Sequence, residues 1–195
     1  APINWAIING EKETGVTTFF IDEKIDTGAI IMQSKIDINP TENAGELHDK
    51  LMHLGSELVL KTVQTIKSGN VKTTVQPQKE TKTAYKLNKD NCKIDWNSSL
   101  DTIYNKVRGL HPYPAAWGLL SNGDELLNIK LYEVHKHFEA HEFENGQLII
   151  SKKAIKVAVK GGYIALINFK FPGKRQMDAE SFLNGFTFDE NAKMI

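Results

Sequence analysis

The hydrophobic positions at the start of the chain predict a short helix followed by two strands. Pro2 suits the first turn of a helix, and Gly10 stops the apolar spacing that begins at Ile3. Two runs rich in β-branched residues, 16–21 and 29–38, then flank a polar connection, as in two strands that meet at a loop. Apolar and charged residues alternate near the end of the second run, so we expect this strand to be half exposed or at a sheet edge.

The clearest helix of the sequence follows Asn43. Asn43 and Glu46 have capping-box spacing, and Gly69 provides a stop. Between them the apolar residues recur at helical spacing and form one stripe. The stripe consists of Leu47, Leu51, Leu54, Leu58, Val63 and Ile66. It predicts a helix that faces the core of an α/β domain.

The second half of the chain changes to a β pattern. Ser98 and Asp101 have capping-box spacing and predict a helix that ends at Gly109. Five short runs separated by glycine-containing turns follow, at 116–120, 127–134, 147–150, 154–159 and 163–169. We expect these strands to form a small closed or nearly closed barrel. A short helix at 178–184 and loosely held last residues should complete the chain.

The composition is that of an ordinary globular protein. Of the 195 residues, 41% are hydrophobic and 25% are charged. No apolar run has the length of a membrane span and the first residues lack a signal-peptide pattern, so we expect a cytoplasmic protein without membrane contact. Cys92 is the only cysteine, which excludes an internal disulfide. His135, His137 and His141 have no matching set of further ligands, and we expect no metal.

Charge is unevenly distributed along a chain whose formal net charge is zero. Between Lys61 and Arg108, ten basic residues accompany four acidic ones. A polyanion would be attracted to this segment first. A solvated basic linker without a partner is the alternative interpretation.

The tripeptide Asp26-Thr27-Gly28 lies between the first two predicted strands. A carboxylate held between two buried strands, beside a glycine that lets a ligand approach, suits proton transfer. Alternatively, Asp26 ties down a turn through hydrogen bonds to the backbone. The same tripeptide occurs in aspartic proteases, but those need two such carboxylates and this sequence has the motif once. A protease would therefore have to dimerise through it.

Several motifs occur in one fixed order along the chain. They are Ala1–Trp5, Gly10, Glu13–Thr17 and Ile25–Gly28, then Ile94–Trp96, Arg108 with His111–Trp117, and Pro172–Met177 with Phe182–Gly185. In this order they resemble the methionyl-tRNA formyltransferase family. The first group resembles the second half of the family's catalytic domain, and the second group resembles its carboxy-terminal domain.

The resemblance implies an α/β, partial Rossmann-like formyltransferase domain followed by a small OB-like β-barrel domain. Residues 1–75 would be the C-terminal part of the catalytic domain, 76–93 a basic linker and 94–195 an OB-like tRNA-binding domain. The implied reaction transfers a formyl group from 10-formyltetrahydrofolate to the amino group of methionyl initiator tRNA, a step of translation initiation. No metal is implied.

The resemblance also implies roles for single residues. Asp26 matches a catalytic aspartate that orients a histidine and relays protons. Asp22, Ile25, Thr27 and Gly28 match the loop beside the folate. The family's Asn-x-His pair, which stabilises the oxyanion, does not occur ahead of Asp26 in this sequence. We therefore expect a fragment that transfers no formyl group alone and that self-associates through residues 1–75.

Phosphate contacts from lysine and arginine would hold the tRNA. Our candidates are Lys82, Lys86, Lys89, Lys93, Arg108, Lys170, Lys174 and Arg175. Two other functions stay open. A related formyltransferase would act on an amino sugar nucleotide, and a non-catalytic OB-type module would bind nucleic acid through exposed stacking aromatics on the barrel.

Overall fold

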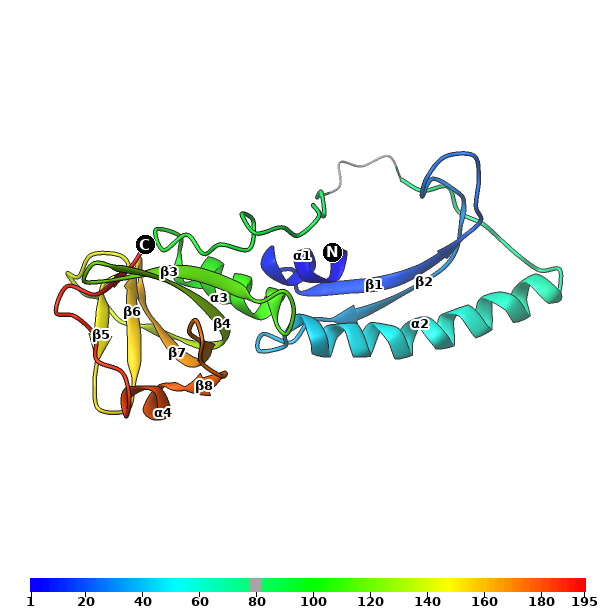
Figure 1. The fold of residues 1–195 in the computed structure, drawn as a ribbon. Coiled ribbons are helices and arrows are strands. Elements are labelled where there is room, and N and C mark those ends of the chain that lie inside the picture. Colours follow the sequence, from blue (N-terminus) through cyan, green and yellow to red (C-terminus); the bar gives the residue numbers. More distant parts are fainter. Residues whose placement is uncertain (78–81) are drawn as a thin grey trace.

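The computed structural model describes residues 1–77 and 82–195. An α/β segment and a barrel-like domain lie at opposite ends of an elongated molecule (Figure 1). The stretch expected to be the linker, 76–93, runs back from the far end of the α/β segment towards the barrel, and its residues 78–81 lie outside the described part.

The α/β segment is built from four elements. They are α1 (Pro2–Ile8), β1 (Glu13–Phe19), β2 (Ile30–Asp37) and α2 (Ala44–Lys67). β1 and β2 pair antiparallel, with Glu13 opposite Asp37, and α2 runs along one side of this two-stranded sheet (Figure 1). These elements confirm the predicted helix, strand, strand, helix order. The Rossmann-like arrangement stays a prediction, because the described residues of the segment contain no parallel strand pair.

The capping box of α2 is confirmed. Asn43 Oδ1 accepts hydrogen bonds from the backbone N–H groups of Gly45 and Glu46, and Glu46 Oε2 accepts one from the Asn43 N–H at 2.9 Å. The expected core stripe is wrong at its end, since Val63 and Ile66 are 44% and 42% exposed. A 24-residue helix is about 36 Å long. An eight-residue strand spans only about 26 Å, so α2 extends beyond the sheet that covers it.

The barrel domain begins with a helix and continues as one curved sheet. Its elements are α3 (Leu100–Leu110), β3 (Ala116–Asn122), β4 (Glu125–Phe138), β5 (Leu148–Ile150), β6 (Ile155–Val159), β7 (Gly162–Lys170), β8 (Met177–Asp178), α4 (Ala179–Leu183) and β9 (Lys193–Met194). The strand order is β5-β6-β7-β4-β3-β9, with β8 added on β7. All five predicted strands are confirmed.

Two contacts bring the ends of the sheet together. Gln147, which precedes β5, forms a bridge with Lys193 of β9. Gly146 accepts a hydrogen bond from Met194 N and donates one to Ala158 O, both at 2.8 Å. The sheet is therefore nearly closed. The expectation of loose last residues is wrong, because Met194 is 2% exposed.

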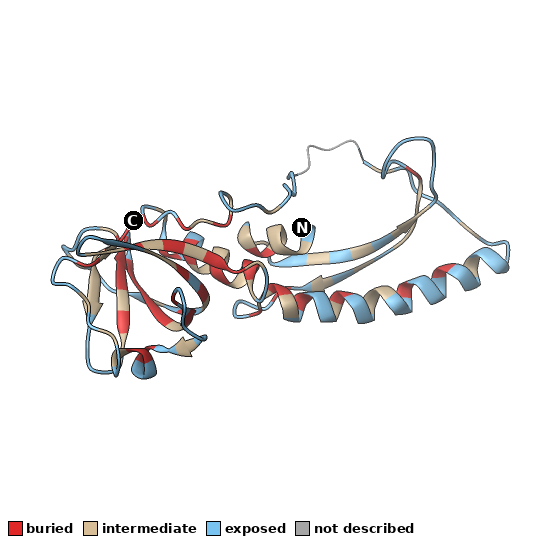
Figure 2. Ribbon diagram, viewed as in Figure 1, coloured by how far each residue is buried: buried red, intermediate tan, exposed pale blue. Residues whose placement is uncertain are grey.

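The largest core of the molecule lies inside this barrel (Figure 2). Phe169, Phe171 and Phe182 pack with ring centroids 4.0 to 5.7 Å apart. α3 covers the core through Ile103 and Val107, each 1% exposed. The capping residue of α3 is Ser99 and not Ser98, because the Ser99 hydroxyl accepts the N–H of Thr102. The Asp101 carboxylate instead pairs with Lys136 of β4.

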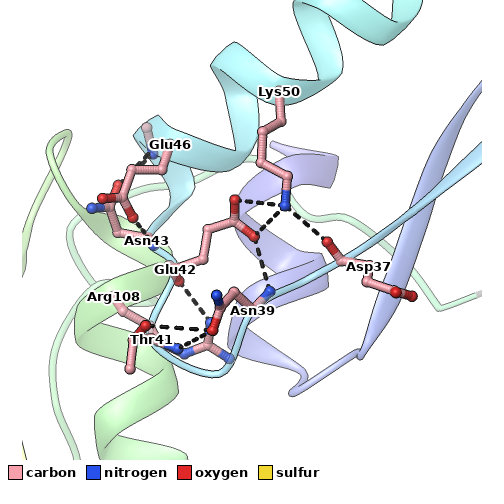
Figure 3. A network of polar contacts seen from close by, with 9 residues as sticks. Asp37, Asn39, Thr41, Glu42, Asn43, Glu46, Lys50 and Arg108 are labelled. Atoms are coloured by element: carbon pink, nitrogen blue, oxygen red, sulfur yellow. Dashed lines mark hydrogen bonds and ion pairs between the residues drawn. The ribbon is translucent and has the colours of Figure 1, made fainter.

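A network of polar contacts joins the two parts of the molecule (Figure 3). Glu42 is 6% exposed, and its carboxylate pairs with Lys50 Nζ at 2.9 Å. Arg108 of α3 donates from Nη1 to the Glu42 carbonyl oxygen at 2.7 Å. Asn4 Nδ2 of α1 donates to the carbonyl oxygen of Gly109 at 2.8 Å. A Cβ at Gly109 would lie 2.7 Å from Ile8 Cγ1, so glycine permits the close approach of α1 and α3.

Candidate functional site

The loop between β1 and β2 carries the candidate catalytic acid at the end of the segment remote from the barrel (Figure 1). Asp22 Oδ1 accepts hydrogen bonds from Lys24 N at 3.0 Å and from Thr27 Oγ1 at 2.7 Å. Gln76 Nε2 donates to the carbonyl oxygens of Asp26 and Gly28 at 2.9 and 2.8 Å. Contacts inside the loop and from a distant residue therefore fix its backbone.

Two residues of this loop have special backbone requirements. Asp26 has φ 58°, in the left-handed region that aspartate tolerates better than most residues. A Cβ at Gly28 would lie 1.5 Å from the Phe20 carbonyl oxygen. Glycine is therefore needed at this position because the backbone of Phe20 packs directly against it. The space into which a ligand was expected to approach Gly28 is occupied by Phe20.

The expected burial of Asp26 between two strands is wrong, because its side chain is exposed. The first predicted strand, 16–21, already ends at Phe19, and the loop extends beyond the sheet. Ile21 and Ile25 are each 91% exposed on either side of Asp22. Two apolar side chains and a carboxylate are therefore presented together to solvent. Ile25 was expected in this loop, whereas Ile21 was predicted to be the last residue of the strand.

The candidate basic residues occupy different environments. Lys82 forms an ion pair with Glu11. Arg108 is part of the polar junction, where burial lowers the pKa of its guanidinium. Lys86, Lys170, Lys174 and Arg175 are exposed. Lys89 and Lys93 lie with their Nζ atoms 5.4 and 5.8 Å from the centre of the Trp117 ring.

Sequence reasoning missed the surroundings of Trp117. Asn88 and Lys89 from the linker stretch and Tyr113, Trp117 and Lys130 from the barrel line one cleft of ≈ 370 Å³. The sequence motif around Trp117 carries the family resemblance but gives no direct indication of a cleft. The signal that could have found this cleft is an aromatic residue at an outward-facing strand position beside a lysine-rich stretch.

The single cysteine lies at the floor of this region. Cys92 is 3% exposed, and burial raises the pKa of its thiol. Burial also lowers the pKa of Lys106, whose ammonium donates to the carbonyl oxygen of Lys93. A buried thiol that stays protonated is a packing residue, so Cys92 is no candidate nucleophile.

Residues 1–77 and 82–195 contain neither a cluster of metal ligands nor a helix suited to cross a membrane. No group of three or more His, Cys, Asp and Glu side chains there is placed to hold a metal ion. None of the helices in that part combines the length and apolar character that a membrane crossing requires. α2 exposes Met52, Val59, Val63 and Ile66 at 42 to 55%. Self-association through this region stays a prediction.

Comparison with known proteins places both parts of the chain. Residues 1–63 match the family described as formyl transferase, and residues 86–187 match the formyl transferase C-terminal domain. The chain is 58% identical over its whole length to a methionyl-tRNA formyltransferase of Flavobacterium johnsoniae and 52% identical to that of Flavobacterium psychrophilum. It spans 62% of the length of each of these relatives.

A solved structure gives the same fold. HypX from Aquifex aeolicus in complex with tetrahydrofolic acid is 20% identical, with a TM-score of 0.66 over 96% of this chain and 33% of HypX. At this identity the likeness concerns the fold alone. The matched domains, in the same order as the two parts seen in the structure, decide the assignment. The chain belongs to the formyl transferase family.

Proposed function

We propose that the protein transfers a formyl group from 10-formyltetrahydrofolate to the amino group of methionyl initiator tRNA. The observation that carries this proposal is the 58% identity over all 195 residues with the Flavobacterium johnsoniae methionyl-tRNA formyltransferase. The order of the two family matches along the chain supports it. We further infer that the α/β segment is part of a Rossmann-like domain and that the nearly closed sheet is OB-like.

Asp26 is the residue through which this chain would take part in the reaction. When the amine attacks the formyl carbon, a nitrogen–carbon bond forms to it and the bond to N10 of the folate breaks. The amine must lose a proton and N10 must gain one, and the carboxylate of Asp26 would accept and return that proton. The hydrogen bonds from Gln76 to the carbonyl oxygens of Asp26 and Gly28 support this role, because they fix the backbone from which the carboxylate projects.

The loop also has features that fit a folate. Exposed Ile25, 91% accessible, offers apolar surface that a flat heteroaromatic ring would cover. Asp22 and Thr27 hydrogen-bond each other at 2.7 Å and leave carboxylate and hydroxyl lone pairs for the polar edge of the ring. Gly28 would contribute through its backbone, as the bend it permits sets the position of the loop.

The test is a chimera in which this chain replaces the matched part of the Flavobacterium johnsoniae relative. In that protein, Asp26→Asn should lower kcat for formyl transfer by about 10²- to 10⁴-fold, because the amide cannot relay a proton. Glu23→Gln, at another exposed acid of the same loop, is the matched control and should stay within about twofold. A kcat for Asp26→Asn within threefold of the parent would disprove the proposed role.

We propose that tRNA is held by the basic residues of the linker stretch and the barrel. Lys174 and Arg175 are exposed beyond β7 and serve as the test. Replacing both with Gln should weaken initiator tRNA binding and reduce the slope of log K against log salt by about two, one for each phosphate contact. Lys152→Gln, an exposed lysine on another barrel loop, should leave the slope unchanged. An unchanged slope in the double variant removes both residues from the site.

The amino sugar nucleotide alternative has one specific support. A likely sugar N-formyltransferase from Mycobacterium tuberculosis is 29% identical over 60% of this chain, with a TM-score of 0.50. Filter binding with initiator tRNA separates the two functions. Binding at physiological salt favours the tRNA substrate, whereas formyl transfer by the chimera to a sugar nucleotide and not to methionyl-tRNA favours the alternative.

A further inference from the structure

We propose that the cleft between the linker stretch and the outer face of the barrel binds one unpaired nucleotide of an RNA. The proposal rests on the proposed function, because it assigns a specific contact to the tRNA substrate. The cleft measures ≈ 370 Å³, at the lower end of the range for ligand pockets of about 300–1,000 Å³. This size suits a single base with its sugar and excludes a folded element.

Trp117 presents a fixed aromatic surface in this cleft. Burial alternates along β3, with Ala116 and Gly118 buried and Trp117 only half-buried, so the Trp117 side chain lies on the outside of the barrel. Its Nε1 donates to the carbonyl oxygen of Lys89 at 2.7 Å. Its backbone N–H donates to Cys92 O at 3.1 Å. The ring therefore cannot turn freely, and stacking a base on it costs little conformational entropy.

A second aromatic residue lines the same cleft. Tyr113 is 83% exposed, and it stands between Pro112 and Pro114, whose fixed φ angles restrict the chain on both sides. An indole and a phenol that line one cleft provide two flat surfaces for the face of a base. Stacking of this kind tolerates any base, because every base has a π-face.

Cations surround the aromatic surface on two sides. Lys89 and Lys93 lie 5.4 and 5.8 Å from the centre of the Trp117 ring. On the other side, strand pairing places Lys130 opposite Trp117 and Lys170 opposite Lys130. Cross-strand partners share one face of a sheet. A row of Trp117, Lys130 and Lys170 thus crosses three strands of the barrel.

The pairing of Lys130 with Lys170 points to an anionic ligand. Like charges directly opposite each other on neighbouring strands destabilise a sheet. A phosphate between the two ammonium groups would turn this repulsion into attraction. Flat aromatic surface beside paired cations matches a base with its flanking phosphates better than it matches an acidic peptide. The carboxylates of such a peptide could bind the lysines, but they would not stack on the indole ring.

The experiment uses the 195-residue chain and two synthetic probes of five nucleotides. One is a single-stranded RNA, and the other has the same backbone without bases. We expect the base-containing probe to bind about five- to tenfold more tightly, which is within the range of one stacking contact. Equal affinity for the two probes would overturn the proposal, as would equally strong competition by a pentaglutamate peptide.

Variants locate the contact. Tyr113→Ala and Trp117→Leu should remove most of the preference for the base-containing probe, while Trp117→Phe should keep most of it. Tyr113 is exposed, so its variant folds even if Trp117→Leu does not, and circular dichroism checks both. Phe138→Ala, an exposed barrel aromatic outside the cleft, should keep the full preference. Trp117→Phe is expected to keep the preference for the base-containing probe. The assignment is contradicted if Tyr113→Ala and a folded Trp117→Leu keep this preference as well.

The test of the cleft and the test of the proposed reaction can fail independently of each other. Loss of formyl transfer in the Asp26→Asn chimera together with no preference for bases would overturn only the cleft. A preference for bases together with a chimera that formylates no tRNA would overturn only the reaction.

Discussion

The two parts of the molecule are stabilised in different ways. Among the described residues, the core of the α/β segment contains five buried apolar residues, whereas that of the barrel contains twenty-three. The nearly closed barrel surrounds its core, whereas most of α2 is exposed or only half-buried (Figure 2), and Val59, Leu60 and Val63 on this helix are 44 to 60% exposed. Burial of apolar area is the main source of stability. We therefore expect the barrel to be stabilised by its own core, and the α/β segment to be the less stable of the two parts.

The two candidate sites follow the same division. The acid of the proposed reaction lies on an exposed loop, and the hydrogen bonds of Asp22 and Gln76 fix that loop without help from a large core. The aromatic cleft lies on strands whose inner sides belong to the barrel core. A site on the barrel is therefore held rigidly by packing, and the site on the loop depends on a few polar contacts.

The largest effect is expected in the barrel core. Phe169→Ala should lower the free energy of unfolding by about 3–5 kcal/mol, because Phe169 is 0% exposed and packs on two other phenylalanines. Phe138→Ala, at a 70% exposed position of the same barrel, should stay within about 0.5 kcal/mol. Urea unfolding followed by circular dichroism measures both. Similar losses in the two variants would contradict a barrel that is stabilised by its core.

A smaller and more local effect is expected in the α/β segment. Leu47→Ala should lower the free energy of unfolding of the α/β segment by about 2–5 kcal/mol, since Leu47 is 0% exposed in the core of this segment. Amide hydrogen exchange should accelerate in β1, β2 and α2 while the barrel amides keep their protection. Leu60→Ala, on the same helix at 60% exposure, is the matched control. Equal loss of protection in the barrel would show that the two parts unfold as one unit.

The junction should contribute less than either core. Arg108→Ala removes a charged donor from the Glu42 carbonyl and should cost about 1.5–3 kcal/mol. Arg108→Lys should restore little of the lost free energy of unfolding, because lysine lacks the guanidinium geometry that reaches Glu42 and Asn105 together. Arg175→Ala, at the only other arginine, tests for a general charge effect. Exchange rates at the first turn of α2 report the loss, and unchanged rates there would remove Arg108 from the junction.

Local patterns predicted most of the fold. The capping box at Asn43 and the five barrel strands depend on residues near each other in the sequence, and the structure confirms them. The exposure of Asp26 and the end of the α2 stripe depend on how far a sheet extends. The position of Arg108 against Glu42 depends on contacts 66 residues apart. Spacing along a chain carries no information on such contacts, so the sequence indicated the acid and the lysines without their surroundings.

The smallest expected effect concerns the cap of α4 at the edge of the barrel. Asp178 Oδ1 accepts the backbone N–H of Ser181 at 2.7 Å, and this hydrogen bond lowers the pKa of the Asp178 carboxyl. A carboxyl whose pKa is lower in the folded than in the unfolded protein stabilises the fold fully above the unfolded value, near 4, and loses this contribution as the pH falls through the folded value. The urea midpoint of the parent should therefore exceed that of Asp178→Ala at pH 7, and the difference should shrink towards pH 2.5. Asp178→Asn keeps an uncharged cap, so its advantage over Asp178→Ala should not vary with pH. If the difference between the parent and Asp178→Ala is the same at both pH values, the charge of Asp178 does not contribute to the cap, and the edge of the barrel is held by packing alone.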